Sequence, residues 1–222
     1  MHEEKHIVIF SHGFGVHKDD NGLFSDISQI LQEVQSIMFD YNEVDEKNNT
    51  LTVKPFSKQV EILKSIISEQ KQIHPNAAID LICHSQGCIV AALTRATGIR
   101  KVFLLSPLMD KGIERTIARY EKNPETIINL NGISKLPRSD GSISLVPAEY
   151  WQERKIEVPP IDLYNKLSEI SEVIIIKPLQ DTILGETSFA GRDEKIVVIE
   201  LNGDHNFTHT RSELCEVIKK LM

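Results

Sequence analysis

Short runs of Val, Ile and Leu recur along this chain, and stretches with helical spacing of apolar residues separate them. A strand with one exposed face alternates apolar and polar residues, whereas these runs are apolar almost throughout. Such strands are buried on both faces, and the intervening helices cover them. The sequence therefore predicts an α/β fold with a mostly parallel central sheet of about six strands and helices on both faces. The expected strands are 6–10, 36–41, 77–83, 101–105, 172–177 and 195–201.

Apolar residues spaced three and four positions apart predict amphipathic helices between these runs. In one of them Val60, Leu63 and Ile67 share a face, and Pro75 marks where that helix should end. Helices and strands thus alternate along most of the chain, as in sheets whose crossovers are helical. The expected helices are 23–34, 56–73, 86–97 and 210–221.

The alternation breaks between residues 109 and 168, where the chain is mixed in polarity and interrupted by several prolines. We expect this segment to be an insertion between the fourth and fifth strands of a single domain, residues 1–222. It should hold helices near 113–122 and 147–153. Residues 139–141, Ser-Asp-Gly, indicate a turn, and their neighbours predict a short hairpin.

Composition argues against several classes of protein. A formal net charge of −7 is unfavourable for binding the phosphates of nucleic acid. Three cysteines do not suggest a disulfide framework. Residues 1–6 are charged and hold no apolar signal segment, and no apolar run reaches the roughly 18 residues of a membrane span. The chain is therefore expected in the cytoplasm without nucleic-acid or membrane partners, and a homodimer is left open as its assembly.

A serine stands where the third expected strand meets the next helix, in Cys83-His84-Ser85-Gln86-Gly87. A sharp strand-to-helix turn lifts the hydroxyl of the turn residue out of the backbone, and it needs small residues two positions before and after. The segment resembles the nucleophile elbow, G-x-S-x-G, of the α/β-hydrolase family, except that Cys83 replaces the first glycine. The resemblance implies that Ser85 is a catalytic nucleophile. The alternative is that Ser85 only caps the helix.

The first expected strand is followed by His12-Gly13-Phe14-Gly15, whose glycines let a ligand approach the backbone. The segment is similar to the oxyanion loop of the same family. This similarity implies that the backbone N–H groups of Phe14 and Gln86 form the oxyanion hole and that His12 braces the loop. An ordinary glycine turn is the alternative. A dinucleotide site is not expected, because the spacing G-x-G-x-x-G is missing.

The resemblance also implies a general base and a carboxylate that orients it. The catalytic histidine of the family follows the last strand, where this chain has His205, and His209 is its competitor. The acid of the family follows the penultimate strand, where Asp181 stands, and Asp204 is its competitor. The order Ser85, Asp181, His205 is that of the family.

The segment 109–168 lies where the family inserts a cap over the nucleophile, and a cap would exclude water and shape a pocket. The arrangement resembles small intracellular serine esterases with an inserted α/β cap, including those that cleave cinnamoyl-type esters. About half of the apolar cap residues are expected only to pack the cap onto the core. The residues expected to contact substrate are His12, Gly13, Leu108, Met109, Leu145 and Trp151.

The expected activity is hydrolysis of a small-molecule carboxylic ester through an acyl-enzyme. Thioesterase, amidase and C–C bond hydrolase activities are alternatives that use the same triad, and a binding module without catalysis is a further hypothesis. No cofactor and no metal are expected, because Cys83, His84 and Cys88 do not match a zinc pattern. Another polar cluster is expected to be a solvated loop and consists of His12, His17, Asp19 and Asp20.

Overall fold

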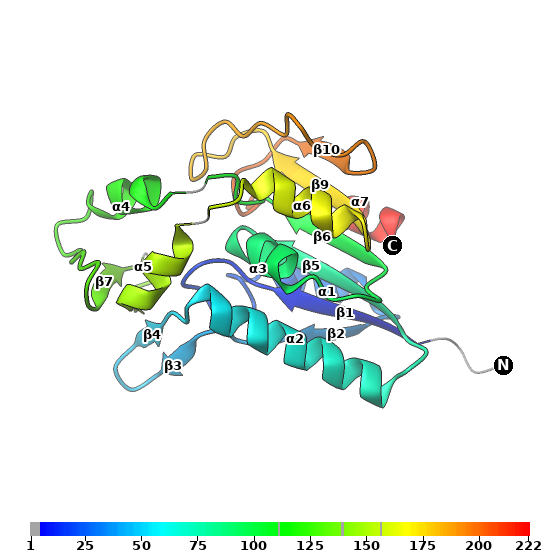
Figure 1. The fold of residues 1–222 in the computed structure, drawn as a ribbon, viewed down its shortest axis with the longest axis horizontal. Coiled ribbons are helices and arrows are strands. Elements are labelled where there is room, and N and C mark those ends of the chain that lie inside the picture. Colours follow the sequence, from blue (N-terminus) through cyan, green and yellow to red (C-terminus); the bar gives the residue numbers. More distant parts are fainter. Residues whose placement is uncertain (1–4, 111, 139, 156) are drawn as a thin grey trace.

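The structure of the chain is a computed structural model that describes residues 5–110, 112–138, 140–155 and 157–222. Its centre is a six-stranded sheet formed by β1 (His6–Ser11), β2 (Gln35–Met38), β5 (Ala78–His84), β6 (Lys101–Leu105), β9 (Glu172–Pro178) and β10 (Val197–Leu201). The strand order is β10-β9-β6-β5-β1-β2, and every neighbouring pair is parallel (Figure 1). The expected parallel sheet is confirmed, with each predicted strand present within a few residues of its predicted bounds.

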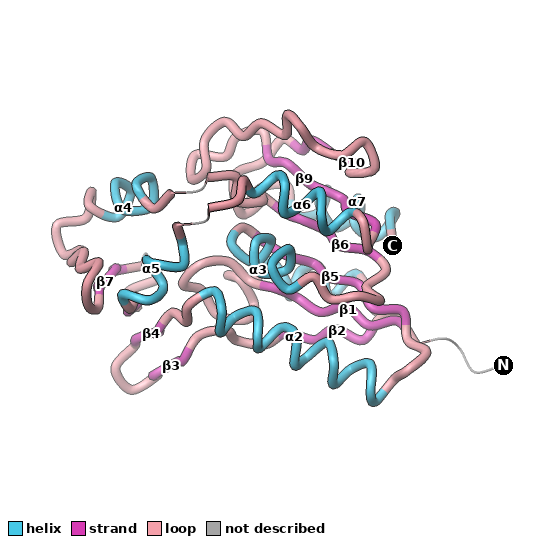
Figure 2. Tube along the Cα trace, viewed as in Figure 1, coloured by secondary structure: helices cyan, strands magenta, loops and turns pink. Residues whose placement is uncertain are grey.

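Helices cover both faces of this sheet, as the tube in Figure 2 shows. One face carries α2 (Phe56–Ile73), α3 (Gln86–Thr94) and α6 (Pro160–Ser168), and the other carries α1 (Leu23–Ile30) and α7 (Arg211–Leu221). The predicted helix 56–73 matches α2 at both ends, and the other three expected helices are also present. No helix within the described ranges is long and apolar enough to cross a membrane.

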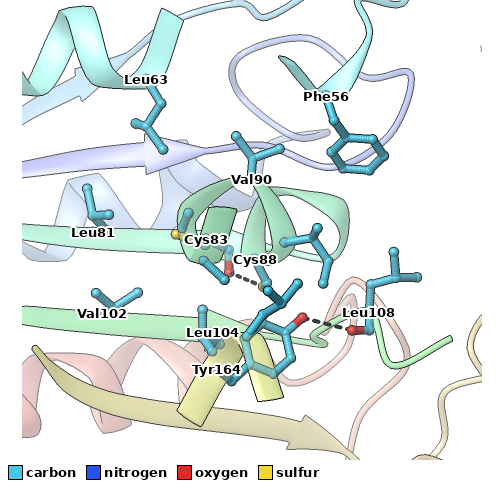
Figure 3. Close-up of a cluster of buried hydrophobic side chains, with 14 of the residues drawn as sticks. Phe56, Leu63, Leu81, Cys83, Cys88, Val90, Val102, Leu104, Leu108 and Tyr164 are labelled. Atoms are coloured by element: carbon cyan, nitrogen blue, oxygen red, sulfur yellow. Dashed lines mark hydrogen bonds between the residues drawn. The ribbon is translucent and has the colours of Figure 1, made fainter. Parts of the chain in front are cut away.

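The core explains why the strand sequences are apolar without interruption. Val102 and Leu104 of β6 belong to the cluster beneath α3 and α6, whereas Phe103 and Leu105 belong to the cluster beneath α1 and α7. Successive side chains of a strand point to opposite faces, so a strand covered on both sides needs apolar residues at every position. Figure 3 shows the first cluster, in which the Tyr164 hydroxyl donates a hydrogen bond to the Leu108 carbonyl at 2.8 Å.

A second, four-stranded sheet stands beyond the carboxyl ends of the main strands (Figure 1). Its order is β3-β4-β8-β7, formed by β3 (Glu43–Asp45), β4 (Thr50–Thr52), β8 (Ile143–Val146) and β7 (Ser134–Pro137). One hairpin therefore follows β2 and the other lies in the predicted insertion, and they join through the parallel pair β4–β8. The hairpin β3–β4 was not predicted, because its strands are only three residues long.

The predicted insertion contains the expected elements. The helices α4 (Glu114–Tyr120) and α5 (Ala148–Arg154) lie where they were expected, and β7 and β8 form the expected hairpin. Its turn includes Gly141 at φ 83°, while Ser139 lies outside the described residues, as do residues 1–4. The last helix of the segment, α6, packs on the helix α3 and on the strand β9 of the main sheet. We call the four-stranded sheet with α4 and α5 the cap.

Candidate active site

Three strands of the main sheet end at the same edge of the sheet, and each leads into a residue of the expected triad. Ser85 lies between β5 and α3, Asp181 follows β9, and His205 follows β10. Because the strands are parallel, their carboxyl ends lie at one edge of the sheet, the edge next to the cap (Figure 1). The fold therefore brings together side chains that are 120 and 24 positions apart in the chain.

The three side chains form a continuous hydrogen-bonded chain. His205 Nε2 lies 3.0 Å from Ser85 Oγ, and His205 Nδ1 lies 2.7 Å from Asp181 Oδ2. The second carboxylate oxygen, Asp181 Oδ1, accepts the backbone N–H groups of Ile183 and Leu184, each at 2.8 Å. A carboxylate beside Nδ1 keeps the proton on that nitrogen, so Nε2 is left to accept the serine proton.

The backbone at Ser85 has the geometry of a nucleophile elbow. Its φ of 52° and ψ of −116° are rare for a residue with a side chain, and they expose the hydroxyl at the strand-to-helix turn. A Cβ at Gly87 would lie 2.1 Å from the carbonyl oxygen of Ser11, so glycine is required there. Cys83, in place of the first glycine of the motif, is fully buried, and burial raises the pKa of its thiol. The thiol therefore stays protonated and does not compete as a nucleophile.

The charges of the triad favour a neutral imidazole. Burial lowers the pKa of His205 from its ordinary value, and this effect outweighs the attraction of Asp181 for a protonated ring. Burial by itself would raise the pKa of Asp181, but the hydrogen bond from His205 and the two backbone N–H groups lower it. His205 is thus a free base, and Asp181 is an anion, at neutral pH.

The competing residues lie elsewhere. His209 is exposed. Asp204 accepts the backbone N–H of Thr208 at 2.7 Å, which is the role of a turn former. The structure therefore joins Ser85 to His205 and Asp181 and to neither competitor.

A second carboxylate–imidazole pair lies next to the triad. Asp20 Oδ2 lies 2.8 Å from His84 Nδ1, and His84 Nε2 lies 2.9 Å from the carbonyl oxygen of His205. Because an acceptor faces each ring nitrogen, His84 must be protonated on both. Burial lowers the pKa of His84, but the negative charge of Asp20 outweighs burial and raises it. The pair is therefore a buried ion pair.

This pair connects three functional loops. Asp20 Oδ2 also accepts the N–H of Gly13 at 2.7 Å, His84 precedes the nucleophile, and the ring of His84 holds the loop of His205. The expectation of a solvated loop is wrong for Asp20 and for His12, because they are 2% and 1% exposed and Asp20 points inward to His84. The sequence signal for this role of Asp20 was His84, because a buried histidine needs a hydrogen-bond partner at each ring nitrogen.

His12 and the glycine loop are held rigidly beside the nucleophile. His12 is 1% exposed, its Nδ1 donates to the carbonyl of Gly13 at 2.9 Å, and its Nε2 accepts the N–H of Tyr41 at 3.0 Å. This pattern requires a neutral ring, and burial lowers the pKa of His12 accordingly. In the described part of the chain, the N–H groups of Phe14 and Gln86 donate no hydrogen bond to the backbone of a loop, turn or cap.

The side chain of Gln86 points away from the nucleophile, toward α2 and the cap. Its Nε2 donates to Gln59 Oε1 at 3.0 Å, and its Oε1 accepts the hydroxyl proton of Tyr150 at 2.5 Å. Tyr150 is 1% exposed and its ring lies 5.1 Å from that of Phe14. The cap therefore contacts both residues that were expected to supply oxyanion donors.

A cavity of about 100 Å³ opens beside Ser85 and His205. Of the six residues expected to contact substrate, the structure places Gly13 on its wall. Met109 lines a different hollow, Leu145 is not among the residues that line this cavity, and Leu108, Trp151 and His12 are buried in the protein interior. The cavity is lined by Gly13, Phe14, Val16, Asp20, Asn21, His84, Ser85, Arg119, Arg138, Ile183, His205 and Asn206.

Two of these lining residues, Arg119 and Arg138, were missed by sequence reasoning. They belong to the cap, in α4 and in the turn after β7, and nothing in their local sequence places them near Ser85. Among the residues that the structure describes, no group of three or more His, Cys, Asp or Glu side chains could hold a metal ion.

Known proteins resemble this chain in structure. No protein-family model and no curated protein matches it. Est1E from Butyrivibrio proteoclasticus, with bound ferulic acid, matches with a TM-score of 0.72 and 18% identity over 99% of this chain and 89% of Est1E. The α/β hydrolase GrgF from Penicillium sp. sh18 matches with a TM-score of 0.68 and 17% identity over 98% of this chain and 89% of GrgF.

The esterase Pf2001 from Pyrococcus furiosus also matches, with a TM-score of 0.61 and 16% identity over 98% of this chain and 82% of Pf2001. These similarities extend over nearly the whole chain, and they agree with its mostly parallel sheet covered by helices. The chain therefore has the α/β-hydrolase fold.

Proposed function

We propose that this protein is a serine hydrolase that cleaves a carboxylic ester through an acyl-enzyme. The observation that carries the proposal is the hydrogen-bonded chain Ser85–His205–Asp181, at 3.0 and 2.7 Å. A helix cap would not need a neutral imidazole at the hydroxyl and a buried carboxylate behind it. The partner proposed for the site is a small-molecule ester.

In the first half-reaction, Ser85 Oγ attacks the carbonyl carbon of the ester while His205 Nε2 takes the hydroxyl proton. Asp181 stabilises the imidazolium that forms. The tetrahedral intermediate then collapses, the bond to the alkoxy oxygen breaks, and His205 returns its proton to the departing alcohol. The acyl group remains on Ser85.

In the second half-reaction, His205 takes a proton from water and the resulting nucleophile attacks the acyl carbon. Collapse of this second intermediate releases the acid and returns the proton to Ser85. His205 is thus proposed to act once as base and once as acid in each half-reaction.

The negative oxygen of both intermediates is proposed to accept the backbone N–H groups of Phe14 and Gln86. Gln86 is the first residue of α3, so its N–H has no partner inside the helix and points along the positive end of the helix dipole. Removing one such donor typically slows an acyl transfer by about 10²- to 10³-fold. The rigid loop around Gly13 and the contacts of the Gln86 side chain support this role.

The ester bond is proposed over thioester, amide and C–C bonds because two of the similar structures are of proteins called esterases, the esterase domain from Rhodothermus marinus and Pf2001. Ferulic acid, the acid released from feruloyl esters, is bound in Est1E. These likenesses support the choice but do not extend to the acyl group, because the fold accommodates many reactions.

The test is hydrolysis of p-nitrophenyl acetate by the wild-type chain and the Ser85→Ala variant. We expect hydrolysis by the wild type and a loss of about 10³-fold or more in the variant, because no other group can form the acyl-enzyme. Ser25→Ala, on the exposed side of α1, is the matched control and should retain wild-type activity. Equal rates in Ser85→Ala and Ser25→Ala would refute the proposal.

A further inference from the structure

The cavity beside Ser85 carries two positive side chains from the cap. Arg119 of α4 and Arg138 of the β7–β8 turn both line it, together with the nucleophile and His205. Each guanidinium presents several N–H donors in a plane and stays charged at any pH of interest. An ester bound at Ser85 would therefore share this cavity with the two guanidinium groups.

No described carboxylate forms an ion pair with either of the two arginines. Neither forms an ion pair with a described residue, whereas Arg154 of the same cap pairs with Asp110 at 2.7 Å. Asp140, in the turn next to Arg138, is attracted to it only weakly, and its lowered pKa is due first to hydrogen bonds from Ser142.

The other charges on the cavity wall cancel. Asp20 and His84 form the buried ion pair described above, and His205 is neutral as a base. Asp181 adds one negative charge behind His205, so the positive charges of Arg119 and Arg138 exceed the negative charge at the site. Such a field attracts anions and disfavours cations.

Both guanidinium groups are held in place by Tyr120, the last residue of α4. The Arg119 guanidinium lies 4.7 Å from the centre of the Tyr120 ring and that of Arg138 lies 6.0 Å away, and Arg138 also donates a hydrogen bond to the Tyr120 hydroxyl. The ring of Tyr120 in turn contacts the ring of Phe14 edge-on, with centroids 6.2 Å apart. The arginines are thus positioned relative to the glycine loop that holds Phe14.

The backbone of that loop leaves room for Arg138. Gly15 has φ of 64°, and a Cβ there would lie 3.2 Å from Arg138 Nη1 and 2.8 Å from Ser144 Oγ. Arg138 therefore packs directly against the loop, and glycine is favoured at position 15 both by its backbone conformation and by the space around it.

We infer that the substrate is an ester that carries an anionic group, a carboxylate or a phosphate, which Arg119 and Arg138 bind while Ser85 attacks the ester carbonyl. This inference rests on the proposed function and adds the substrate class. A guanidinium matches the oxygens of either anion with paired hydrogen bonds.

The inference is tested with pairs of esters that differ only in charge. Monoethyl succinate is compared with ethyl 4-methylpentanoate, in which an isopropyl group replaces the carboxylate. A carboxylate on the alcohol side is tested with 3-acetoxypropionate against 3-methylbutyl acetate, and 2-acetoxyethyl phosphate tests a phosphate. For at least one of the three anionic esters, kcat/KM should exceed that of the neutral ester by about tenfold or more. The neutral reference for the phosphate ester is 3-methylbutyl acetate.

The variants Arg119→Gln and Arg138→Gln should each lower that preference about tenfold, and Arg138→Lys should restore part of it because the charge remains. Arg115→Gln is the matched control: it lies one turn earlier in α4 and lines a different hollow. The preference in Arg115→Gln should equal that of the wild type.

Failure of this inference differs from failure of the proposed function. If the wild type hydrolyses the neutral esters as fast as all the anionic ones, or if the glutamine variants keep the preference, the anionic substrate class is wrong and the hydrolase remains. If the wild type hydrolyses no ester, calorimetric titration of Ser85→Ala with monoethyl succinate still tests whether the site binds an anionic ester. Binding that Arg119→Gln weakens supports the anion site, and absence of binding overturns it.

Discussion

The two sheets of this molecule differ in size, in direction and in their proposed work. The main sheet has six parallel strands and carries Ser85, Asp181 and His205 on the loops at its carboxyl edge. The cap sheet has four short strands drawn from two separate parts of the chain, and its neighbourhood contributes Arg119 and Arg138. The comparison separates the groups proposed to perform the reaction from the groups proposed to select the substrate.

Specific side-chain contacts join the two regions. Tyr150 of the cap donates to the side chain of Gln86, and Tyr120 and Tyr150 both contact the ring of Phe14. Gln86 and Phe14 are the two residues whose backbone N–H groups are proposed for the oxyanion hole. Changes in the main sheet should therefore alter kcat strongly. Changes at Arg119 and Arg138 should alter the preference among substrates, and changes at the cap tyrosines should alter kcat modestly.

The largest effect is expected from Asp181→Asn. An amide at this position can donate to Nδ1 and leave the proton on Nε2, which then cannot accept the serine proton. We expect kcat for p-nitrophenyl acetate to fall by about 10⁴-fold with little change in KM. Asp204→Asn is the matched control, and its loss should be far smaller. Similar losses of kcat in both variants would contradict the specific role of Asp181 as the partner of His205.

Asp20→Asn should produce the next largest effect, on stability. Asp20 and His84 are each 2% exposed, and removing one partner leaves a buried positive charge without compensation. We expect urea denaturation to show a loss of about 3–5 kcal/mol in the free energy of unfolding. The double variant Asp20→Asn/His84→Gln should be more stable than Asp20→Asn alone. A single variant as stable as the wild type would show that the pair is not charged.

The same pair has a defined pH window. The folded pKa of His84 lies above its ordinary value of about 6.5, so its contribution is present at lower pH and is lost as the pH rises through the folded value. The folded pKa of Asp20 lies below its ordinary value of about 3.9, so its contribution is lost as the pH falls through the folded value. The stability difference from Asp20→Asn should be largest between the two folded pKa values.

Tyr150→Phe tests the contact between cap and sheet. It removes the only hydroxyl donor described for Gln86 Oε1 and leaves that oxygen buried without a partner, at about 1–3 kcal/mol. We expect a several-fold loss of kcat, because the turn that holds the Gln86 N–H loses one of its supports. Trp151→Phe, which changes a neighbouring buried ring, is the comparison. Equal kcat values in Tyr150→Phe and the wild type would show that the hydrogen bond from Tyr150 does not support the oxyanion hole.

The smallest effect concerns the acid limb of the pH profile. His205 acts as a base only when it is neutral, and burial lowers its pKa from the ordinary value of about 6.5. The ratio kcat/KM for a neutral ester should therefore rise with pH through a midpoint below about 6.5. A midpoint above this value would mean that the attraction of Asp181 outweighs burial.

The main sheet could be predicted from sequence because its signals are local. A doubly buried strand is apolar at every position, and an elbow needs small residues at fixed offsets from Ser85. The placement of His205 and Asp181 came from the family resemblance, which supplied the long-range order that local patterns lack.

The cap could not be predicted to the same depth. Its hairpin β3–β4 has three-residue strands, and its pairing with β8 joins residues about ninety positions apart, such as Thr50 and Ile143. Arg119 and Arg138 reach the cavity only through that tertiary arrangement. Asp20 was missed for the same reason, since its partner His84 lies 64 positions away.

The most direct test of the central claim is labelling with a fluorophosphonate, followed by mass spectrometry of the intact chain and of its peptides. We predict a single adduct on the peptide that contains Ser85, absent from Ser85→Ala and formed much more slowly in His205→Ala. A folded wild-type chain that forms no adduct, or an adduct on another residue with Ser85 unmodified, would contradict the proposal that Ser85 is an activated nucleophile.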